Sequence, residues 1–320
     1  MAKYPDKIKV GITMGDPAGV GPQIIAKAFK RLTNSAEFVI IADAWVLEKV
    51  TGHRSHVSGL KVIDLNNVNQ KNFQFGKVRA ENGRSSIEYL DKALDLIQVG
   101  KIDCLVTCPV SKEAVNLAGI SFSGHTEYLA QHTGTEDFVM MLLNRKLKIS
   151  LVTRHIPISS VSGQLTKEKI YKTTYITHQS LRKIFSIKNP RIVVTALNPH
   201  ASDNGLIGDE ENRIIRPALN KLKHLTGYIH GPISADAAIL KAAEKKYDCV
   251  VAMYHDQALI ALKLSGIFHG VNITLGLPFV RTSPLHGTAF DIAKTNSADP
   301  CALIEAIKLA IKCARNLKRV

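Results

Sequence analysis

The sequence predicts an α/β protein whose central sheet is largely parallel. Short apolar runs rich in valine and isoleucine alternate along the chain with longer stretches whose apolar residues recur every three or four positions. The short runs are almost continuously apolar, which is typical of strands buried on both faces. The longer stretches have the periodicity of amphipathic helices. Such an alternation favours parallel strands joined by helical crossovers.

The expected strands are eight apolar runs, beginning with IKVGITM and ending with DCVVAMY. They cover residues 8–14, 37–42, 60–65, 103–108, 137–143, 147–153, 191–197 and 248–254. The expected helices are the amphipathic stretches between and after these runs. They cover residues 22–32, 81–98, 165–185, 210–225, 234–246 and 301–317.

No internal repeat, low-complexity tract or flexible linker interrupts this pattern. The irregular stretch 65–80, rich in Asn and Gln, is expected to be a long surface loop. We therefore treat 1–320 as one continuous catalytic unit, in which any boundary between subdomains cannot be read from the sequence.

Composition indicates a globular protein of the cytoplasm. The chain has 320 residues, of which 45% are hydrophobic, enough for a large core. No apolar run approaches the roughly 20 residues that a membrane span requires, and the N-terminus lacks a signal-peptide pattern. The five cysteines are an odd count and lie mostly in apolar stretches, so we expect them to be reduced and structural.

The net charge of +15 raises the possibility of nucleic-acid binding. The basic residues are scattered, however, and the densest groups, at 144–148 and 316–320, are short and accompany no recognised binding motif. We expect a solvated surface that attracts anionic substrates, with neither nucleic acid nor membrane as a partner.

Three histidines follow three of the expected strands within a few residues. They are His155 in LVTRHIP, His200 in VVTALNPH and His255 in VVAMYHD. Ligands of open α/β sheets collect beyond the carboxyl ends of the strands, so these side chains can converge on one site. Three neutral imidazoles suit a catalytic divalent metal, because they leave a coordination position open for substrate or water.

Each histidine taken alone is more simply a hydrogen-bonding residue near a loop. The repetition favours the metal, and polar neighbours add to it. Asp256 adjoins His255, while Asn198 precedes His200 and Asp203 follows it, so each of these two histidines has a polar neighbour that can fix the tautomer of its ring. The remaining histidines that fall in expected helices or polar loops are expected at the surface: His53, His56, His178, His224 and His230.

Several long motifs, in order, resemble one known family. They are TMGDPAGVGPQ at 13–23, SGHTEYLA at 123–130, MYHDQALIALK at 253–263 and GVNITLGLPFVRTSPLHGTAFDIA at 270–293. Together with the histidine segments, they make the chain similar to 4-hydroxythreonine-4-phosphate dehydrogenases over nearly its whole length.

This resemblance implies a fold and a reaction. The implied fold is that of isocitrate and isopropylmalate dehydrogenases, with two intertwined α/β subdomains and an interdomain cleft. The implied reaction is the NAD- or NADP-linked oxidation of 4-phosphooxy-L-threonine to 2-amino-3-oxo-4-phosphooxybutanoate. That β-keto acid then loses carbon dioxide to give 3-amino-2-oxopropyl phosphate, in the biosynthesis of pyridoxal 5'-phosphate. The family forms homodimers, and the implied active site is shared across the interface.

The resemblance also implies roles for individual residues. The implied metal ligands are His155, His200 and His255. Imidazole ligands suit zinc, cobalt, manganese or nickel, and the resemblance adds magnesium. The implied substrate contacts are His125, Thr126, Lys263, Asn272 and Arg281.

Physical chemistry is consistent with these substrate contacts. Lys263 and Arg281 are cationic donors for phosphate or carboxylate, although a lone lysine in a helix is usually a solvated surface residue. His125 and Thr126 stand where a helix should begin, and a helix N-terminus favours a phosphate. A plain helix cap is an equally acceptable interpretation of Thr126 and does not exclude binding.

The cofactor and the proton acceptor are less well defined. Gly15, Gly19 and Gly21 do not have the spacing of a dinucleotide fingerprint, so that segment predicts a tight turn, and the cofactor is expected at the loop from Gly276 to His286. The candidate proton acceptors are Asp256, Lys263 and Asp236.

Three departures from the family pattern and one rival activity are relevant. Leu285 stands where an acidic residue is usual, Cys108 replaces a usual glycine, and ASDNG at 201–205 replaces a Gly-rich acidic stretch. Leu285 lies in the expected cofactor loop, so it bears on the choice between NAD and NADP. The rival activity is that of a paralogous dehydrogenase acting on threonate or erythronate, free or phosphorylated.

Overall fold

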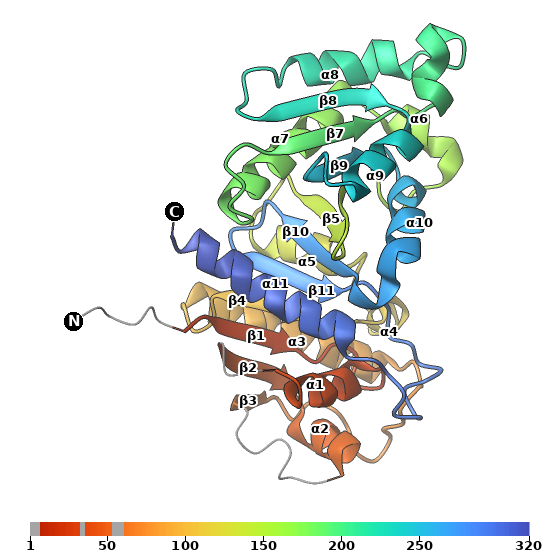
Figure 1. The fold of residues 1–320 in the computed structure, drawn as a ribbon. Helices are drawn as coiled ribbons and strands as arrows, with labels where there is room; N and C mark the ends of the chain where they lie inside the picture. The colour runs from red at the N-terminus through yellow and green to blue at the C-terminus, as the bar shows by residue number, and fades with distance from the viewer. Residues whose placement is uncertain (1–6, 33–35, 53–60, 320) are drawn as a thin grey trace, which may run out of the picture. The chain divides into compact units, whose positions relative to one another are not determined.

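The computed structural model describes residues 7–32, 36–52 and 61–319, and the expected surface residues His53 and His56 lie outside this range. The chain divides into two compact units (Figure 1). The first unit contains Met1–Gly134 and Leu277–Lys318, and the second contains Thr135–Gly276. Within the described residues, the strands and helices alternate along the chain as the sequence predicts, and the strands are largely parallel.

The first unit contains five described strands in the order β3-β2-β1-β4-β11, and all of their pairings are parallel. Their bounds are β1 Lys9–Thr13, β2 Glu37–Ala42, β3 Lys61–Asp64, β4 Cys104–Thr107 and β11 Val280–Pro284. Its helices are α1 Gly21–Phe29, α2 Ala44–Thr51, α3 Ala80–Gln98, α4 Lys112–Leu117, α5 His125–His132 and α11 Cys301–Leu317.

Helix packing follows the amphipathic patterns. Along α11, buried residues such as Leu303, Ile307 and Ile311 recur at helical spacing, and this face packs on β11 and β4. Helix α3 packs on β1 and β2 and also against α4. Helices α4 and α5 follow β4 along the chain, and their first residues, Lys112 and His125, belong to the polar group described below.

The second unit contains six described strands in the order β10-β5-β6-β9-β7-β8. Strand β5 is antiparallel to both of its neighbours, and the other pairings are parallel. Their bounds are β5 Val139–Leu143, β6 Lys148–Leu151, β7 Arg191–Thr195, β8 Tyr228–Ile233, β9 Cys249–Ala252 and β10 Val271–Leu275.

The helices of the second unit pack on this sheet. Their bounds are η2 Ile158–Ser160, α6 Val161–Gln164, α7 Lys167–Lys183, η3 Pro199–Gly205, η4 Glu211–Ile215, α8 Arg216–Asn220, α9 Ala235–Ala243, α10 His255–Gly266 and η5 Ile267–His269. Helix α7 packs on β5, β6 and β10, α9 packs on β7 and β9, and α10 packs on β5, β6 and β9.

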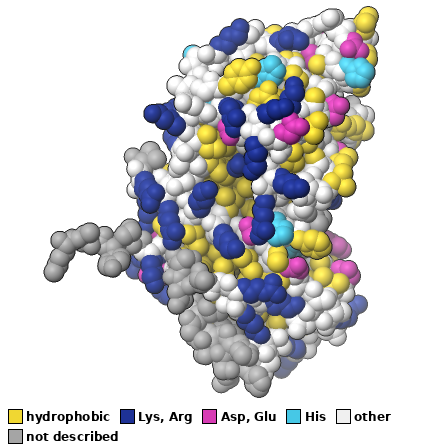
Figure 2. Space-filling model, viewed as in Figure 1, with side chains coloured by type: hydrophobic (Ala, Val, Ile, Leu, Met, Phe, Trp, Pro, Cys, Tyr) yellow, Lys and Arg dark blue, Asp and Glu magenta, His cyan; other side chains and the backbone are white. Residues whose placement is uncertain are grey.

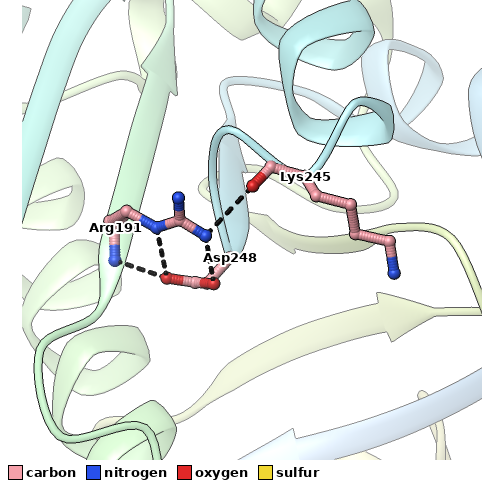
Figure 3. Close-up of polar contacts among 3 residues, drawn as sticks. All are labelled: Arg191, Lys245 and Asp248. Carbon is pink, nitrogen blue, oxygen red and sulfur yellow. Dashed lines mark hydrogen bonds and ion pairs between the residues drawn. The ribbon is translucent and has the colours of Figure 1, made fainter.

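The starts of β7 and β9 are joined by a polar cluster (Figure 3). The guanidinium of Arg191 donates from Nε and Nη2 to the two carboxylate oxygens of Asp248, at 3.2 and 3.0 Å, and from Nη2 to the carbonyl of Lys245 at 3.0 Å. Because Arg191 begins β7 and Asp248 immediately precedes β9, the cluster fixes the register at which these strands start.

Three further expectations can be compared with the structure. All five cysteines are free, and four of them are buried. The surface placement of His178 is wrong: its side chain is fully buried on α7, where Nε2 lies 2.6 Å from the carbonyl of Thr226. On the face seen in Figure 2, lysine and arginine side chains are spread widely and do not gather in one stripe.

Candidate functional site

The three strand-end histidines leave the same edge of the second unit's sheet. Strands β6, β9 and β7 are adjacent and parallel, and His155, His255 and His200 follow their carboxyl ends by four, three and five residues. The turns that carry these histidines are therefore neighbours, as the sequence pattern predicts.

His155 and His255 lie together. Their ring centroids are 5.5 Å apart and the rings are inclined by 51°. Two imidazoles bound to one metal at about 2.1 Å, with a tetrahedral angle, would have centroids about 5.4 Å apart. The observed separation therefore fits a shared metal ion. Both rings line a hollow of ≈ 250 Å³, whose wall includes Arg154, Tyr254 and Asp256.

His200 is placed differently. Its side chain is 76% exposed, and in the described part of the chain no set of three His, Cys, Asp or Glu residues is close enough together to hold a metal. The residues His200–Asn204 all have positive φ, between 43° and 69°. L-residues adopt this left-handed conformation rarely and at a cost, so the turn is held by contacts elsewhere.

A carboxylate orients two of the three imidazoles. Nδ1 of His255 lies 2.7 Å from Oδ1 of Asp256, and Nδ1 of His200 lies 3.2 Å from Oδ2 of Asp203. These are the two partners expected from the sequence. A proton on Nδ1 leaves Nε2 as the ligand atom, which is the usual arrangement at protein metal sites. Imidazole nitrogen is a donor type that suits a divalent metal, and among the described residues His155 and His255 are the two assigned ligands that lie together.

The other expected residues of the second unit are spread over its elements. Asp236 is in the first turn of α9; a hydrogen bond from Ser234, a backbone N–H and the nearby His200 hold its pKa below the ordinary value. Lys263 is exposed on α10. Asn272 is on β10, and its Oδ1 is buried and accepts no hydrogen bond from any described residue.

Gly276 directly follows β10 and has a structural reason to be glycine. Its φ is +99°, and a Cβ there would lie 2.6 Å from the carbonyl oxygen of Asp137. A side chain could not be accommodated without moving the backbone. The role expected for Gly276 in cofactor binding stays a prediction.

In the first unit, Arg281 is a buried cation at the centre of a polar group. It extends from β11, is only 2% exposed, and donates from Nε and Nη2 to Oγ1 of Thr107, at 3.2 and 2.6 Å. Burial lowers the pKa of Arg281 to about 10, and the charge of Glu127 opposes that shift. The guanidinium therefore remains positive at neutral pH.

His125 begins α5 in the same group. Burial lowers the pKa of His125, and the charges of Arg281 and Lys112 lower it further, although a hydrogen bond to the Cys108 backbone opposes them. The ring is therefore neutral at pH 7, and its Nε2 is buried with no hydrogen-bond partner among the residues that the structure describes. Thr126 follows it in the first turn and is also buried. A neutral ring that donates from Nδ1 offers Nε2 as an acceptor.

The group as a whole is suited to a small anion that carries a hydrogen-bond donor. Arg281 and Lys112 supply positive charge, and the first turn of α5 supplies backbone N–H groups. Nε2 of His125 can accept from a hydroxyl or an ammonium group.

The glycine-rich segment after β1 forms the tight turn that its spacing predicts. Gly15 has φ +72°, and a Cβ there would lie 2.3 Å from the carbonyl oxygen of Pro109. The N–H of Val20 donates to the carbonyl of Thr288 at 3.0 Å, so this turn supports the loop that follows β11. In that loop, Nε2 of His286 is buried, has no hydrogen-bond partner in the described ranges 7–32, 36–52 and 61–319, and is a candidate contact for a cofactor.

Two buried polar residues are not among those expected from the sequence to have a role. Thr107 belongs to an apolar strand, but its place at the carboxyl end of β4 is a signal that could have identified it. Asp16 lies in the motif TMGDPAGVGPQ and has no role assigned from the sequence. It is fully buried, and burial raises its pKa to about 7 against the opposing hydrogen bond from the Ala18 N–H.

The fold and these two groups of residues define an α/β enzyme with paired imidazoles at the carboxyl edge of one sheet and a buried cationic group in its other unit. The chain belongs to the family of the pyridoxal phosphate biosynthetic protein PdxA, whose family model matches residues 18–310. It is an oxidoreductase, and the resemblance predicted from its motifs is confirmed.

Individual relatives agree with this assignment. The chain is 42% identical to a 4-hydroxythreonine-4-phosphate dehydrogenase of Sulfurihydrogenibium, over 96% of this chain and 99% of the relative. It is 40% identical to the D-threonate 4-phosphate dehydrogenase of Salmonella typhimurium, over 95% and 98%. The crystal structure of a 4-hydroxythreonine-4-phosphate dehydrogenase from Klebsiella pneumoniae matches with a TM-score of 0.86 and 36% identity, over 98% of this chain and 99% of that one.

Proposed function

We propose that this protein oxidises 4-phosphooxy-L-threonine with NAD or NADP to 2-amino-3-oxo-4-phosphooxybutanoate, which decarboxylates to 3-amino-2-oxopropyl phosphate. The observation that carries this proposal is membership of the PdxA family combined with retention of the residue types the reaction needs. The implied role is a step in the biosynthesis of pyridoxal 5'-phosphate.

We assign binding of an anionic group of the substrate to the residues around Arg281. A guanidinium can donate two parallel hydrogen bonds to a carboxylate or phosphate, and Thr107 already fixes its orientation from one side. Nε2 of His125 would accept from a substrate hydroxyl or ammonium group, because its pKa keeps the ring neutral. The buried Thr126 would support the same contact from the first turn of α5.

We assign the divalent metal to His155, His200 and His255. A bound divalent metal would supply Lewis-acid chemistry at the substrate hydroxyl and during decarboxylation, and a bound nicotinamide would supply the oxidant. Asp256 and Asp203 hold Nδ1 of two of the rings, so that Nε2 is oriented for the ion. An imidazole set favours zinc, cobalt or manganese over magnesium, which prefers oxygen ligands.

The proton acceptor is proposed among Asp256, Asp236 and Lys263. Asp256 contacts an assigned ligand, and Asp236 lies close enough to His200 for the two to interact electrostatically. The cofactor is proposed at the loop from Gly276 to His286. A homodimer in the cytoplasm, with its active site shared between subunits, completes the proposal. Among the described residues, no helix has both the length and the apolar character needed to cross a membrane.

The second candidate substrate is D-threonate 4-phosphate, because a relative of that name is 40% identical. The two substrates differ at C2, where one carries an ammonium and the other a hydroxyl. Nε2 of His125, which is buried and has no hydrogen-bond partner within the described part of the chain, is an acceptor. An ammonium offers more donors to such an atom than a hydroxyl does, which supports the amino substrate.

The test is product formation by chelator-treated protein with each cofactor and one added metal at a time. The proposal expects NADH or NADPH and carbon dioxide in equal amounts from 4-phosphooxy-L-threonine. Absence of turnover with every combination of cofactor and metal would contradict it.

A further inference from the structure

Two consecutive glutamates, Glu210 and Glu211, bind the start of the loop that carries His200 to its end. Glu211 is completely buried, and its Oε1 accepts hydrogen bonds from the backbone N–H groups of Leu197 and Asn198, at 2.9 and 2.8 Å. Its Oε2 accepts from Nδ2 of Asn198 at 3.0 Å. One side chain at the start of η4 therefore holds the chain just before His200.

Glu210 extends this attachment to the segment that carries His155. Its Oε2 accepts from Nδ2 of Asn198 at 2.8 Å, and its Oε1 accepts from Oγ of Ser162 at 2.5 Å. Ser162 lies in α6, directly after Val161, and Val161 lines the same hollow as His155. One carboxylate thus joins two of the segments that bear assigned ligands.

The turn between these anchors would not hold its shape unaided. The residues His200–Asn204 are left-handed without a glycine among them, and each such residue costs about 1–2 kcal/mol relative to ordinary backbone. Ser202 in this turn is buried, and its hydroxyl forms no hydrogen bond with another described residue. A turn of this kind persists only where its ends are fixed by surrounding contacts.

We propose that Glu210 and Glu211, here called the carboxylate clamp, are positioning residues that set the place of His200 relative to the segment of His155. The inference rests on the proposed function, in which both histidines bind the metal. The clamp does not touch the metal ligands themselves. It acts through Asn198, two residues before His200, and through Ser162.

The variants that test this are Glu210→Ala, Ser162→Ala and Glu211→Gln. Glu211→Gln keeps an oxygen for the two backbone N–H groups but faces an amide NH₂ toward Asn198. The matched control is Asp209→Asn, which alters the neighbouring carboxylate, paired with Arg213 in an exposed ion pair. Two readouts are needed: amide hydrogen exchange of the metal-free protein, and titration of chelator-treated protein with Zn²⁺ and with Co²⁺.

Exchange measured without metal tests the clamp independently of the proposed reaction. Glu210→Ala should raise exchange about 10-fold or more in residues 197–205 and 158–162, because local opening becomes easier. Ser162→Ala should raise exchange in residues 158–162. The double variant of Glu210→Ala and Ser162→Ala should exchange there at nearly the same rate as either single variant, since both changes remove the hydrogen bond between Ser162 and Glu210. Unchanged exchange in Glu210→Ala and Glu211→Gln would overturn the clamp.

The metal titration tests its role at the site. We expect Glu210→Ala and Glu211→Gln to weaken Zn²⁺ and Co²⁺ binding about 10- to 100-fold, the usual effect of losing a residue that orients a ligand, while Asp209→Asn stays within about twofold of the wild type. Wild-type affinity in both clamp variants, despite faster exchange, would overturn the positioning role. If the wild-type protein binds neither Zn²⁺ nor Co²⁺, both the proposed metal site and the positioning role are wrong. The exchange measurement then decides alone whether the carboxylate clamp holds the loop of His200.

Discussion

Thr107 accepts two hydrogen bonds from the guanidinium of Arg281, and Thr107→Val tests whether they hold Arg281 in place. Valine has nearly the shape of threonine but lacks the hydroxyl that accepts two hydrogen bonds from the buried guanidinium, at 3.2 and 2.6 Å. Hydrogen bonds to a charged group contribute roughly 1.5–3 kcal/mol, and burial prevents water from replacing them. Because Glu127 still attracts the guanidinium, we expect a loss of about 2 kcal/mol in the free energy of unfolding.

The control is Thr107→Ser, which keeps the hydroxyl and removes one methyl group at a cost of about 0.8 kcal/mol. Urea denaturation followed by circular dichroism should place Thr107→Val at least about 1 kcal/mol below Thr107→Ser. Loss of a fixed orientation of Arg281 should also raise KM for the phosphorylated substrate about 10-fold, equivalent to about 1.4 kcal/mol. A valine variant with wild-type stability and KM would refute the reasoning, and equal damage in both variants would show that the hydroxyl is not the cause.

Three further predictions concern other parts of the chain. Burial raises the pKa of Asp16 from 3.8 to about 7, so its contribution to stability is present below pH 4 and is lost as pH rises towards 7. Between about pH 4 and 7, Asp16→Asn should reduce the slope of the unfolding free energy against pH by at most about 1.4 kcal/mol per pH unit. An unchanged slope would contradict the raised pKa of Asp16. Arg191→Met should lower the free energy of unfolding, measured by urea denaturation, by about 1 kcal/mol, because the Arg191 side chain in its ion pair with Asp248 is half exposed. A loss above about 3 kcal/mol would show that the ion pair is stronger than this exposure implies. His255→Ala should abolish turnover at low metal concentration and weaken Co²⁺ binding in a titration, and near-normal binding would remove His255 from the metal site.

Much of the fold could be predicted from the sequence because most strands are apolar throughout. All eight expected strands are present, and the expected helices begin within a few residues of the observed ones. Strands β8, β10 and β11 were missed. Strand β8 contains His230 and Pro232, and β11 contains the buried Arg281, so neither has a continuous apolar run. Their places in the sheet depend on neighbours that are distant in sequence.

The candidate site could be predicted only in part. Placement of the three histidines at adjacent strand ends followed from the α/β pattern, and their carboxylate partners followed from proximity in sequence. Contacts between distant segments could not be predicted in this way. Thr107 and Arg281 are 174 residues apart, and Ser162 and Glu210 are 48 apart, so only the folded chain brings them together.

The central claim is that this chain oxidises 4-phosphooxy-L-threonine, and one comparison of substrates tests it most directly. Chelator-treated protein, resupplied with Zn²⁺, Co²⁺ or Mn²⁺ and with each nicotinamide cofactor, would be assayed with 4-phosphooxy-L-threonine and with D-threonate 4-phosphate. We predict a kcat/KM at least about 10-fold higher for the amino substrate, equivalent to about 1.4 kcal/mol of preference for the ammonium group. A higher kcat/KM for D-threonate 4-phosphate would contradict the account.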